Sequence, residues 1–341
     1  MNHEHALQIT IADLVQTGRG ILAADESTPT IAKRFQAIGV ESTEENRRTY
    51  RSLLLTTPGL GEFISGVILF EETLAQQSDA ATLLPAAAWA QKIVPGIKVD
   101  KGKIPLALHP GDEVTEGLDD LAKRLASYHE QGARFAKWRE VYTIGEYLPS
   151  ANGIEANAEM LARYAAVCQN DGFVPIVEPE VLLDGKHTIE RCEEVTEETL
   201  RITFSALMEQ RVHLEGMILK PSMVVSGKDN ARQAGVDEVA ERTIRCLKRT
   251  VPGAVPGIAF LSGGQSAVSA TEHLNKMNQI GPQPWQVSFS FARALQDPAL
   301  KAWKGEPGNV AAAQKVFYHR AKMNSAARSG SYTQAMEAAA A

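Results

Sequence analysis

Short apolar segments alternate with longer amphipathic segments along the whole 341-residue chain. The apolar segments are rich in Ile, Val, Leu and Phe, and most begin at Gly or Pro, as is typical of buried parallel strands. They cover residues 20–25, 66–70, 96–100, 135–139, 174–180, 216–221, 257–263 and 287–291. The intervening sequence has apolar residues at helical spacing, most clearly in 43–55, 119–130, 154–170 and 197–210. The pattern predicts eight strands that alternate with helices.

The number and order of these segments favour an α/β fold in which the strands close into a (β/α)8 barrel, also called a TIM barrel. An open sheet that binds a dinucleotide would carry a GxGxxG motif after its first strand, and none follows residues 20–25. No repeat and no linker rich in Pro, Gly or Ser divides the chain. We therefore expect a single catalytic domain, residues 1–330, and a flexible, alanine-rich C-terminal tail, residues 331–341.

Charged residues interrupt five of the apolar strands, mostly near their C-terminal ends, where barrel enzymes build their active sites. The charged pairs in the fourth and fifth strands are two positions apart, so both members of a pair point to the same side. Burying such charges without mutual pairing costs on the order of several kcal/mol per ion. We expect one compensated cluster, with a purely structural ion network as the alternative. The residues are Asp25, Lys98, Lys137, Arg139, Glu178, Glu180 and Lys220.

Lys220 is the candidate nucleophile because its strand is otherwise apolar. Desolvation and a nearby ammonium group such as Lys137 both lower the pKa of a lysine, and a neutral amine can attack a ketone. Either Glu178 or Glu180 could supply the proton that imine formation needs, since two close carboxylates are not both comfortably ionised. Asp25 is suited to act as the base on a substrate hydroxyl.

A phosphate site is predicted after the seventh and eighth strands, its usual place in this architecture. The sequence LSGGQS, which includes Ser262 and Gly263, leaves backbone N–H groups open to an anion before a helix. Arg293 adds a cation just after the neighbouring strand.

Composition excludes several other classes of function. The net charge of −6 argues against a nucleic acid or a polybasic membrane surface as the partner. The three cysteines are widely spaced, the eight histidines lack metal-ligand spacing, and no GxSxG motif is present. No signal peptide and no run of about 20 apolar residues is found. We expect a cytoplasmic protein without a metal ion or another cofactor.

The motifs ILAADES, GVILFEETL, GIKVDKG, FAKWR, VPIVEPE, ILKPSMV, FLSGGQS and RALQDPALKAW resemble those of the class I fructose-1,6-bisphosphate aldolases over roughly residues 8–332. The resemblance implies a metal-independent lyase, generally a homotetramer. In glycolysis and gluconeogenesis it would reversibly cleave fructose 1,6-bisphosphate to dihydroxyacetone phosphate and glyceraldehyde 3-phosphate. By the same resemblance Lys220 forms the Schiff base, and Glu178, beside Glu180, is the acid/base of imine formation.

The resemblance also implies roles for the other charged residues. Asp25 takes the proton of the C4 hydroxyl, and Lys137, Arg139 and Lys98 form a cationic wall. The C1 phosphate contacts Ser262, Gly263 and Arg293, and Ser27 and Arg34 lie toward the C6 phosphate.

The chain departs from the family's usual residues at three places. Pro29-Thr30 replaces Gly-Ser, Ala292 replaces a Gly whose φ could be positive, and the chain ends in alanines where animal members have a tyrosine. Two other functions stay open at this point. One is a Schiff-base barrel enzyme of altered specificity, resembling a transaldolase or preferring a monophosphate, and the other is a non-enzymatic scaffold.

Overall fold

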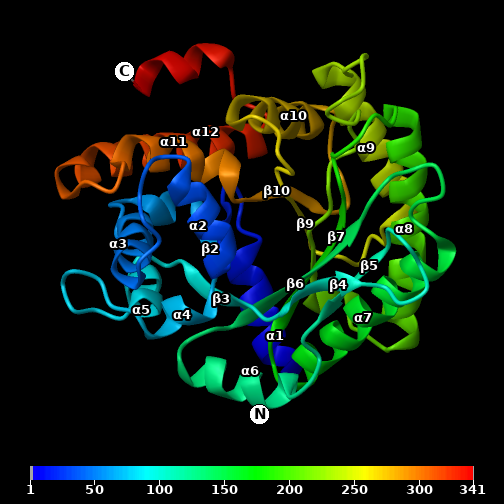
Figure 1. Cartoon of the computed structure of the whole chain (residues 1–341), viewed down its shortest axis with the longest axis horizontal. Helices are drawn as coiled ribbons and strands as arrows, with labels where there is room; N and C mark the ends of the chain where they lie inside the picture. Colours follow the sequence, from blue (N-terminus) through cyan, green and yellow to red (C-terminus); the bar gives the residue numbers. More distant parts are fainter. Residues whose placement is uncertain (1–2, 341) are drawn as a thin grey trace.

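Eight parallel strands close into a barrel in the computed structural model, which describes residues 3–340 (Figure 1). Around the barrel the strands follow one another in the order β1-β10-β9-β8-β7-β6-β3-β2. The predicted α/β barrel is therefore confirmed. The strands are β1 Gly20–Ala24, β2 Ile64–Leu69, β3 Val94–Lys98, β6 Phe135–Tyr142, β7 Val174–Val181, β8 Ile218–Leu219, β9 Gly257–Phe260 and β10 Gln286–Phe291.

Helices surround the barrel and cover its outer face. Each of the four amphipathic segments predicted from the sequence is helical. Thr43, Ser150 and Thr188 cap three of the helices, each accepting a hydrogen bond from a backbone N–H in the first turn. The helices are α1 His3–Leu14, α2 Thr28–Gln36, α3 Glu44–Leu55, α4 Glu71–Ala75, α5 Leu84–Ala90, α6 Leu121–Glu130, α7 Ala151–Asn170, α8 Ile189–Glu209, α9 Val236–Thr250, α10 Ala267–Gln279, α11 Arg293–Trp303 and α12 Val310–Arg328.

The largest departures from the sequence pattern are a longer helix and an additional hairpin. Helix α8 begins at Ile189, eight residues before the predicted start, because Thr188 caps its first turn. The sequence pattern missed this turn because charged residues there interrupt the apolar spacing of the helix. The hairpin consists of β4 Gly102–Pro105 and β5 Glu113–Glu116, which pair antiparallel. Its first strand is exposed at every position, so it lacks the apolar signal of a buried strand.

The barrel interior is filled from below by side chains of α1, which pack against inward-facing residues of the strands. Phe135 is a fully buried member of this layer. A Cβ atom on Gly96 would lie 2.3 Å from the Phe135 ring, so only glycine leaves room for the ring there. The lower part of the barrel is a packed core, and the functional site is left to the opposite end.

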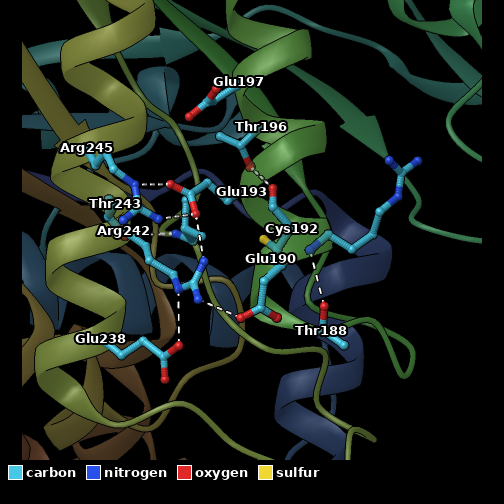
Figure 2. Close-up of polar contacts among 12 residues, drawn as sticks. Thr188, Glu190, Cys192, Glu193, Thr196, Glu197, Glu238, Arg242, Thr243 and Arg245 are labelled. Atoms are coloured by element: carbon cyan, nitrogen blue, oxygen red, sulfur yellow. Dashed lines mark hydrogen bonds and ion pairs between the residues drawn. The ribbon is translucent and has the colours of Figure 1, made fainter.

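Ion pairs join α8 to α9 on the outside of the barrel (Figure 2). The buried Glu193 accepts hydrogen bonds from Arg242 at 2.9 Å and from Arg245 at 2.5 Å. Figure 2 shows both arginines reaching from α9 toward this carboxylate. Because Glu193 has two guanidinium partners, the pairs fix the packing of the two helices.

The C-terminal segment contacts α12 and α10. Residues Gln334–Ala340 form a 3-10 helix, Tyr332 is buried, and Arg320 pairs with Glu337 at 2.5 Å. The domain boundary at residue 330 and the flexibility of residues 331–341 stay predictions, which hydrogen exchange would measure. Met1, Asn2 and Ala341, which those ranges include, lie outside the described residues. None of the helices within residues 3–340 combines the length and the hydropathy that a membrane span needs.

Candidate active site

A cavity of about 540 Å³ lies at the C-terminal ends of the barrel strands. All twelve candidate residues from the sequence line it, although they come from elements far apart in the chain. They are Asp25, Ser27, Arg34, Lys98, Lys137, Arg139, Glu178, Glu180, Lys220, Ser262, Gly263 and Arg293. The volume suits a substrate of the size of a small phosphorylated sugar.

Lys220 follows β8 and is almost fully buried, with 3 % of its surface exposed. Its backbone N–H donates to Val177 O at 2.8 Å, which continues the pairing with β7 and fixes the direction of the side chain. Its Nζ lies 3.1 Å from Oε1 of Glu178. An amine and a carboxylate, both almost fully buried, are therefore within hydrogen-bonding distance of each other.

Lys137 on β6 connects the carboxylates at the centre of the site. Its Nζ lies 2.9 Å from Oδ2 of Asp25 and 3.2 Å from Oε2 of Glu178. Burial acts to lower the pKa of Lys137, but Asp25, Glu178 and Asp100 outweigh it and hold the pKa well above its ordinary value. Burial likewise acts to raise the pKa of Asp25, but Lys137 and Lys220 hold it well below the usual range. Lys137 is therefore a fixed cation and Asp25 a fixed anion at neutral pH.

The two glutamates of β7 have different partners. Glu178 contacts Lys137 and Lys220, whereas Glu180 pairs with Arg139 at 3.0 Å. From the sequence we expect repulsion between two close carboxylates to keep one of them protonated. In the structure the two carboxylates have separate partners, and each faces a cation instead.

Asp100 is a member of the site that the sequence analysis did not single out. Its Oδ1 lies 2.6 Å from Nζ of Lys98, and its Oδ2 lies 3.9 Å from Nζ of Lys137. The available signal was its position, two residues after Lys98 at the end of the third strand. Asp100 holds Lys98 at the wall of the cavity and adds a third carboxylate around Lys137.

The predicted phosphate loop lies beside Arg293, the first residue of α11. Gly263 and Gly264 have positive φ values of 55° and 94°, and a Cβ atom on Gly264 would lie 3.3 Å from Nη2 of Arg293. The glycines therefore let the backbone approach the guanidinium closely. Ala292 has φ −102°, so the strain considered for a non-glycine residue there does not arise.

The other end of the cavity is formed by Ser27 and the first turns of α2. Pro29 lies in the first turn, where its missing N–H breaks no helical hydrogen bond, and the Ser27 and Thr30 hydroxyls are 3.1 Å apart. Arg34 pairs with Glu26 at 2.5 Å. Glu26, which the sequence analysis missed, therefore neutralises part of the positive charge at this end.

The fold and the cavity together define a (β/α)8-barrel enzyme with a buried lysine among carboxylates and an anion-binding loop beside it. Within residues 3–340, no three His, Cys, Asp or Glu side chains gather in a way that could hold a metal ion.

Comparison with known proteins identifies the family. The family model described as class-I fructose-bisphosphate aldolase, a glycolytic enzyme, matches residues 6–341. A protein of Xanthomonas campestris described as a probable fructose-bisphosphate aldolase class 1 is 58% identical over 95% of this chain and 97% of its own length. The fructose-bisphosphate aldolase of Dictyostelium discoideum is 51% identical over 98% and 95% of the two chains.

A solved structure leads to the same family. The fructose-bisphosphate aldolase of Plasmodium falciparum, determined in complex with TRAP and a small-molecule inhibitor, superposes with a TM-score of 0.96. It is 49% identical and the match covers 97% of this chain and 96% of that one. The chain belongs to the class I fructose-bisphosphate aldolases. It is a lyase of glycolysis that acts on a sugar bisphosphate.

Proposed function

We propose that Lys220 is the Schiff-base lysine and that the groups around it divide the proton transfers of aldol cleavage. The observation that carries the proposal is the chain of contacts from Lys220 through Glu178 and Lys137 to Asp25. Each link is 3.2 Å or shorter, and all four side chains line the same cavity.

Schiff-base formation begins when Nζ of Lys220 attacks the C2 carbonyl of open-chain fructose 1,6-bisphosphate. Glu178, 3.1 Å from Nζ, takes one proton from Nζ as the amine attacks C2. The C2 oxygen takes a second proton from the attached nitrogen, and Glu178 returns the first proton to the resulting hydroxyl, which leaves as water and gives the iminium. Lys137, 3.2 Å from Oε2 of Glu178, holds this carboxylate in place during these transfers.

Cleavage follows from the iminium. Asp25 removes the proton of the C4 hydroxyl, the C3–C4 bond breaks, and its electron pair passes to C3 and the iminium to give an enamine. Glyceraldehyde 3-phosphate leaves. Asp25 gives up the proton it took, C3 of the enamine takes up one proton, and hydrolysis of the resulting imine by one water molecule releases dihydroxyacetone phosphate and the free Lys220. The low pKa of Asp25 makes it a weak base, so its proximity to the hydroxyl is the main contribution.

The remaining residues of the cavity bind the substrate. We propose that Ser262, Gly263 and Arg293 hold the C1 phosphate, and that Ser27 and Arg34 lie toward the C6 phosphate. Lys98, Arg139 and Glu180 orient the hydroxyl groups between them. Because Arg34 pairs with Glu26 at 2.5 Å, part of its charge is already neutralised, and we expect the C6 phosphate to be bound more weakly than the C1 phosphate. The ratio of kcat/KM for fructose 1,6-bisphosphate and fructose 1-phosphate measures this difference.

Reduction of the imine tests the nucleophile. Borohydride added with dihydroxyacetone phosphate should attach the three-carbon unit to Lys220 irreversibly, also in the presence of EDTA, and peptide mass spectrometry locates the adduct. Lys220→Met should abolish both the adduct and the cleavage activity. Lys228→Met, which removes an exposed lysine nearby in the chain, should retain both. An adduct on another lysine, or none in active wild-type protein, would contradict the mechanism.

We also infer a homotetramer located in the cytoplasm. The support is the resemblance to the family and the description of an Arabidopsis thaliana relative, 53% identical, as cytosolic, although a Chlamydomonas reinhardtii relative is described as chloroplastic. Light scattering should give a particle of four 37.0 kDa chains. Cell fractionation tests the location.

A further inference from the structure

The hairpin β4–β5 contributes to the wall of the cavity, although it is outside the barrel. Lys101, Gly102 and Lys103, at its start, line the cavity together with the barrel residues. Because Lys103 pairs with Thr115 across the hairpin, the position of Thr115 determines where these lysines lie. The second strand, β5, packs against β6 (Figure 1).

A fully buried carboxylate, Glu140 on β6, connects the hairpin to the barrel. Its Oε2 accepts a hydrogen bond from the backbone N–H of Thr115 at 3.0 Å, and its Oε1 accepts one from Nε1 of Trp138 at 2.7 Å. Thr115 also donates through its hydroxyl to the backbone oxygen of Arg139 at 2.8 Å. The hairpin is therefore tied to β6 at Arg139, whose side chain lines the cavity, and at the next residue, Glu140.

The two hydrogen bonds are stronger with the ionised form of Glu140, because each carboxylate oxygen faces an N–H donor and protonation turns one of the oxygens into a hydroxyl, a weaker acceptor. Burial raises the pKa of Glu140 to about 7, although the bonds from Trp138 and Thr115 act in the opposite direction. Asp100 adds to the rise, and Glu140 in turn acts to raise the pKa of Tyr142 on the same strand. The carboxylate is thus ionised above this pH and neutral below it.

We propose that Glu140 is a positioning residue that clamps the hairpin β4–β5 to β6 and thereby sets the places of Arg139 and of the hairpin lysines at the cavity. Glu140 does not touch the substrate. It acts through the backbone of Thr115 and through its neighbour in β6. The inference rests on the proposed function, in which Arg139 orients the substrate.

Substrate affinity in Glu140→Gln across pH tests the proposal. Glutamine keeps the size of the side chain, but its NH2 group cannot accept a hydrogen bond, so one of the two N–H donors loses its partner. We expect KM for fructose 1,6-bisphosphate to rise about 3- to 10-fold above pH 7, with kcat within about twofold. Below pH 7 the wild-type carboxyl is neutral as well, so the ratio of the two KM values should fall toward about 1. Titration of the substrate phosphates affects both proteins and cancels in this ratio.

The matched control is Glu116→Gln, which removes a carboxylate from an exposed position on β5, next to Thr115. It should leave KM within about twofold of the wild type at every pH. A ratio for Glu140→Gln that stays at 1, or one that is raised equally at all pH values, would overturn the proposal, as would an equal effect of Glu116→Gln.

Hydrogen exchange at Thr115 and borohydride trapping at Lys220 complete the test. If Glu140→Gln does not fold, hydrogen exchange at the Thr115 amide of the wild type is measured instead. After correction for the intrinsic rate, its protection should decrease as the pH falls through about 7, and constant protection would contradict the clamp. Borohydride trapping at Lys220 of the wild type separates the two proposals. Trapping with an unaltered KM in Glu140→Gln refutes only the positioning role, and an absence of trapping refutes the proposed mechanism.

Discussion

Replacing Lys137 by methionine removes the cation that lies among the carboxylates of the site. The methionine fills a similar volume, so the main change is electrostatic. Asp25 and Glu178 lose a partner at 2.9 Å and 3.2 Å, and Asp100 loses one at 3.9 Å. All three carboxylates are buried, so water cannot replace the ammonium group fully.

The expected loss follows from this geometry. Removing one partner of a buried ion pair costs about 3–5 kcal/mol because it leaves an uncompensated charge. For a chain of this length that loss lowers the melting temperature by about 4–7 °C. Lys103→Met is the matched control, since Lys103 pairs with Glu113 in an exposed position and should contribute about 1 kcal/mol or less.

The loss should also depend on pH in a defined direction. In the wild type the depressed pKa of Asp25 gives stability that is present above 3.8 and is lost only as the pH falls through the lower folded value. In Lys137→Met this contribution is smaller, because the cation that lowers the pKa of Asp25 most is gone and burial, which raises that pKa, is opposed by Lys220 and Lys98 alone. The variant should therefore recover part of its deficit as the pH falls from about 7 to about 5. Urea unfolding at the two pH values measures this. A loss below about 1 kcal/mol at neutral pH, or a deficit that grows on acidification, would refute the reasoning.

Three further outcomes are expected. Arg293→Ala should raise KM about 10- to 100-fold because a charge-assisted phosphate contact is lost, and unaltered steady-state kinetics would contradict that role. Glu193→Gln should lower the free energy of unfolding by about 1–2 kcal/mol through weaker bonding to Arg245, with kcat unchanged; denaturant titration and a cleavage assay check both. Gly96→Ala should destabilise the barrel by about 1–3 kcal/mol because its Cβ would lie 2.3 Å from Phe135, and wild-type stability would show that the ring can move aside.

Most of the barrel could be predicted from the sequence because each strand is a local signal. A buried parallel strand is a short apolar run, and all eight runs became strands. The hairpin β4–β5 was missed for the same reason. Its first strand is exposed, and it forms because residues 102–105 meet 113–116, a pairing that no local pattern announces.

The candidate residues of the site could be named from sequence because charges at the C-terminal ends of barrel strands converge on one face. Those twelve residues do line one cavity, while their individual roles stay predictions. Asp100, at the end of the predicted third strand, and Glu26, just after the first, were not singled out because an acidic residue at such a position usually faces solvent. These two carboxylates can be buried because cations from other parts of the chain pair with them, and the local sequence does not show those pairs.

The sequence by itself thus determined the class of fold, the family and the set of side chains at the mouth of the barrel, since strand periodicity and motif spacing are properties of the chain. Only the tertiary structure decided which charge faces which. Glu178 lies against Lys220 and Lys137, while Glu180, two positions along the same strand, faces Arg139. These partners come from other strands, and the register between the strands determines which of them comes within about 3 Å. The energy of a charge pair falls as the distance grows, so a small difference in register decides which pair is strong.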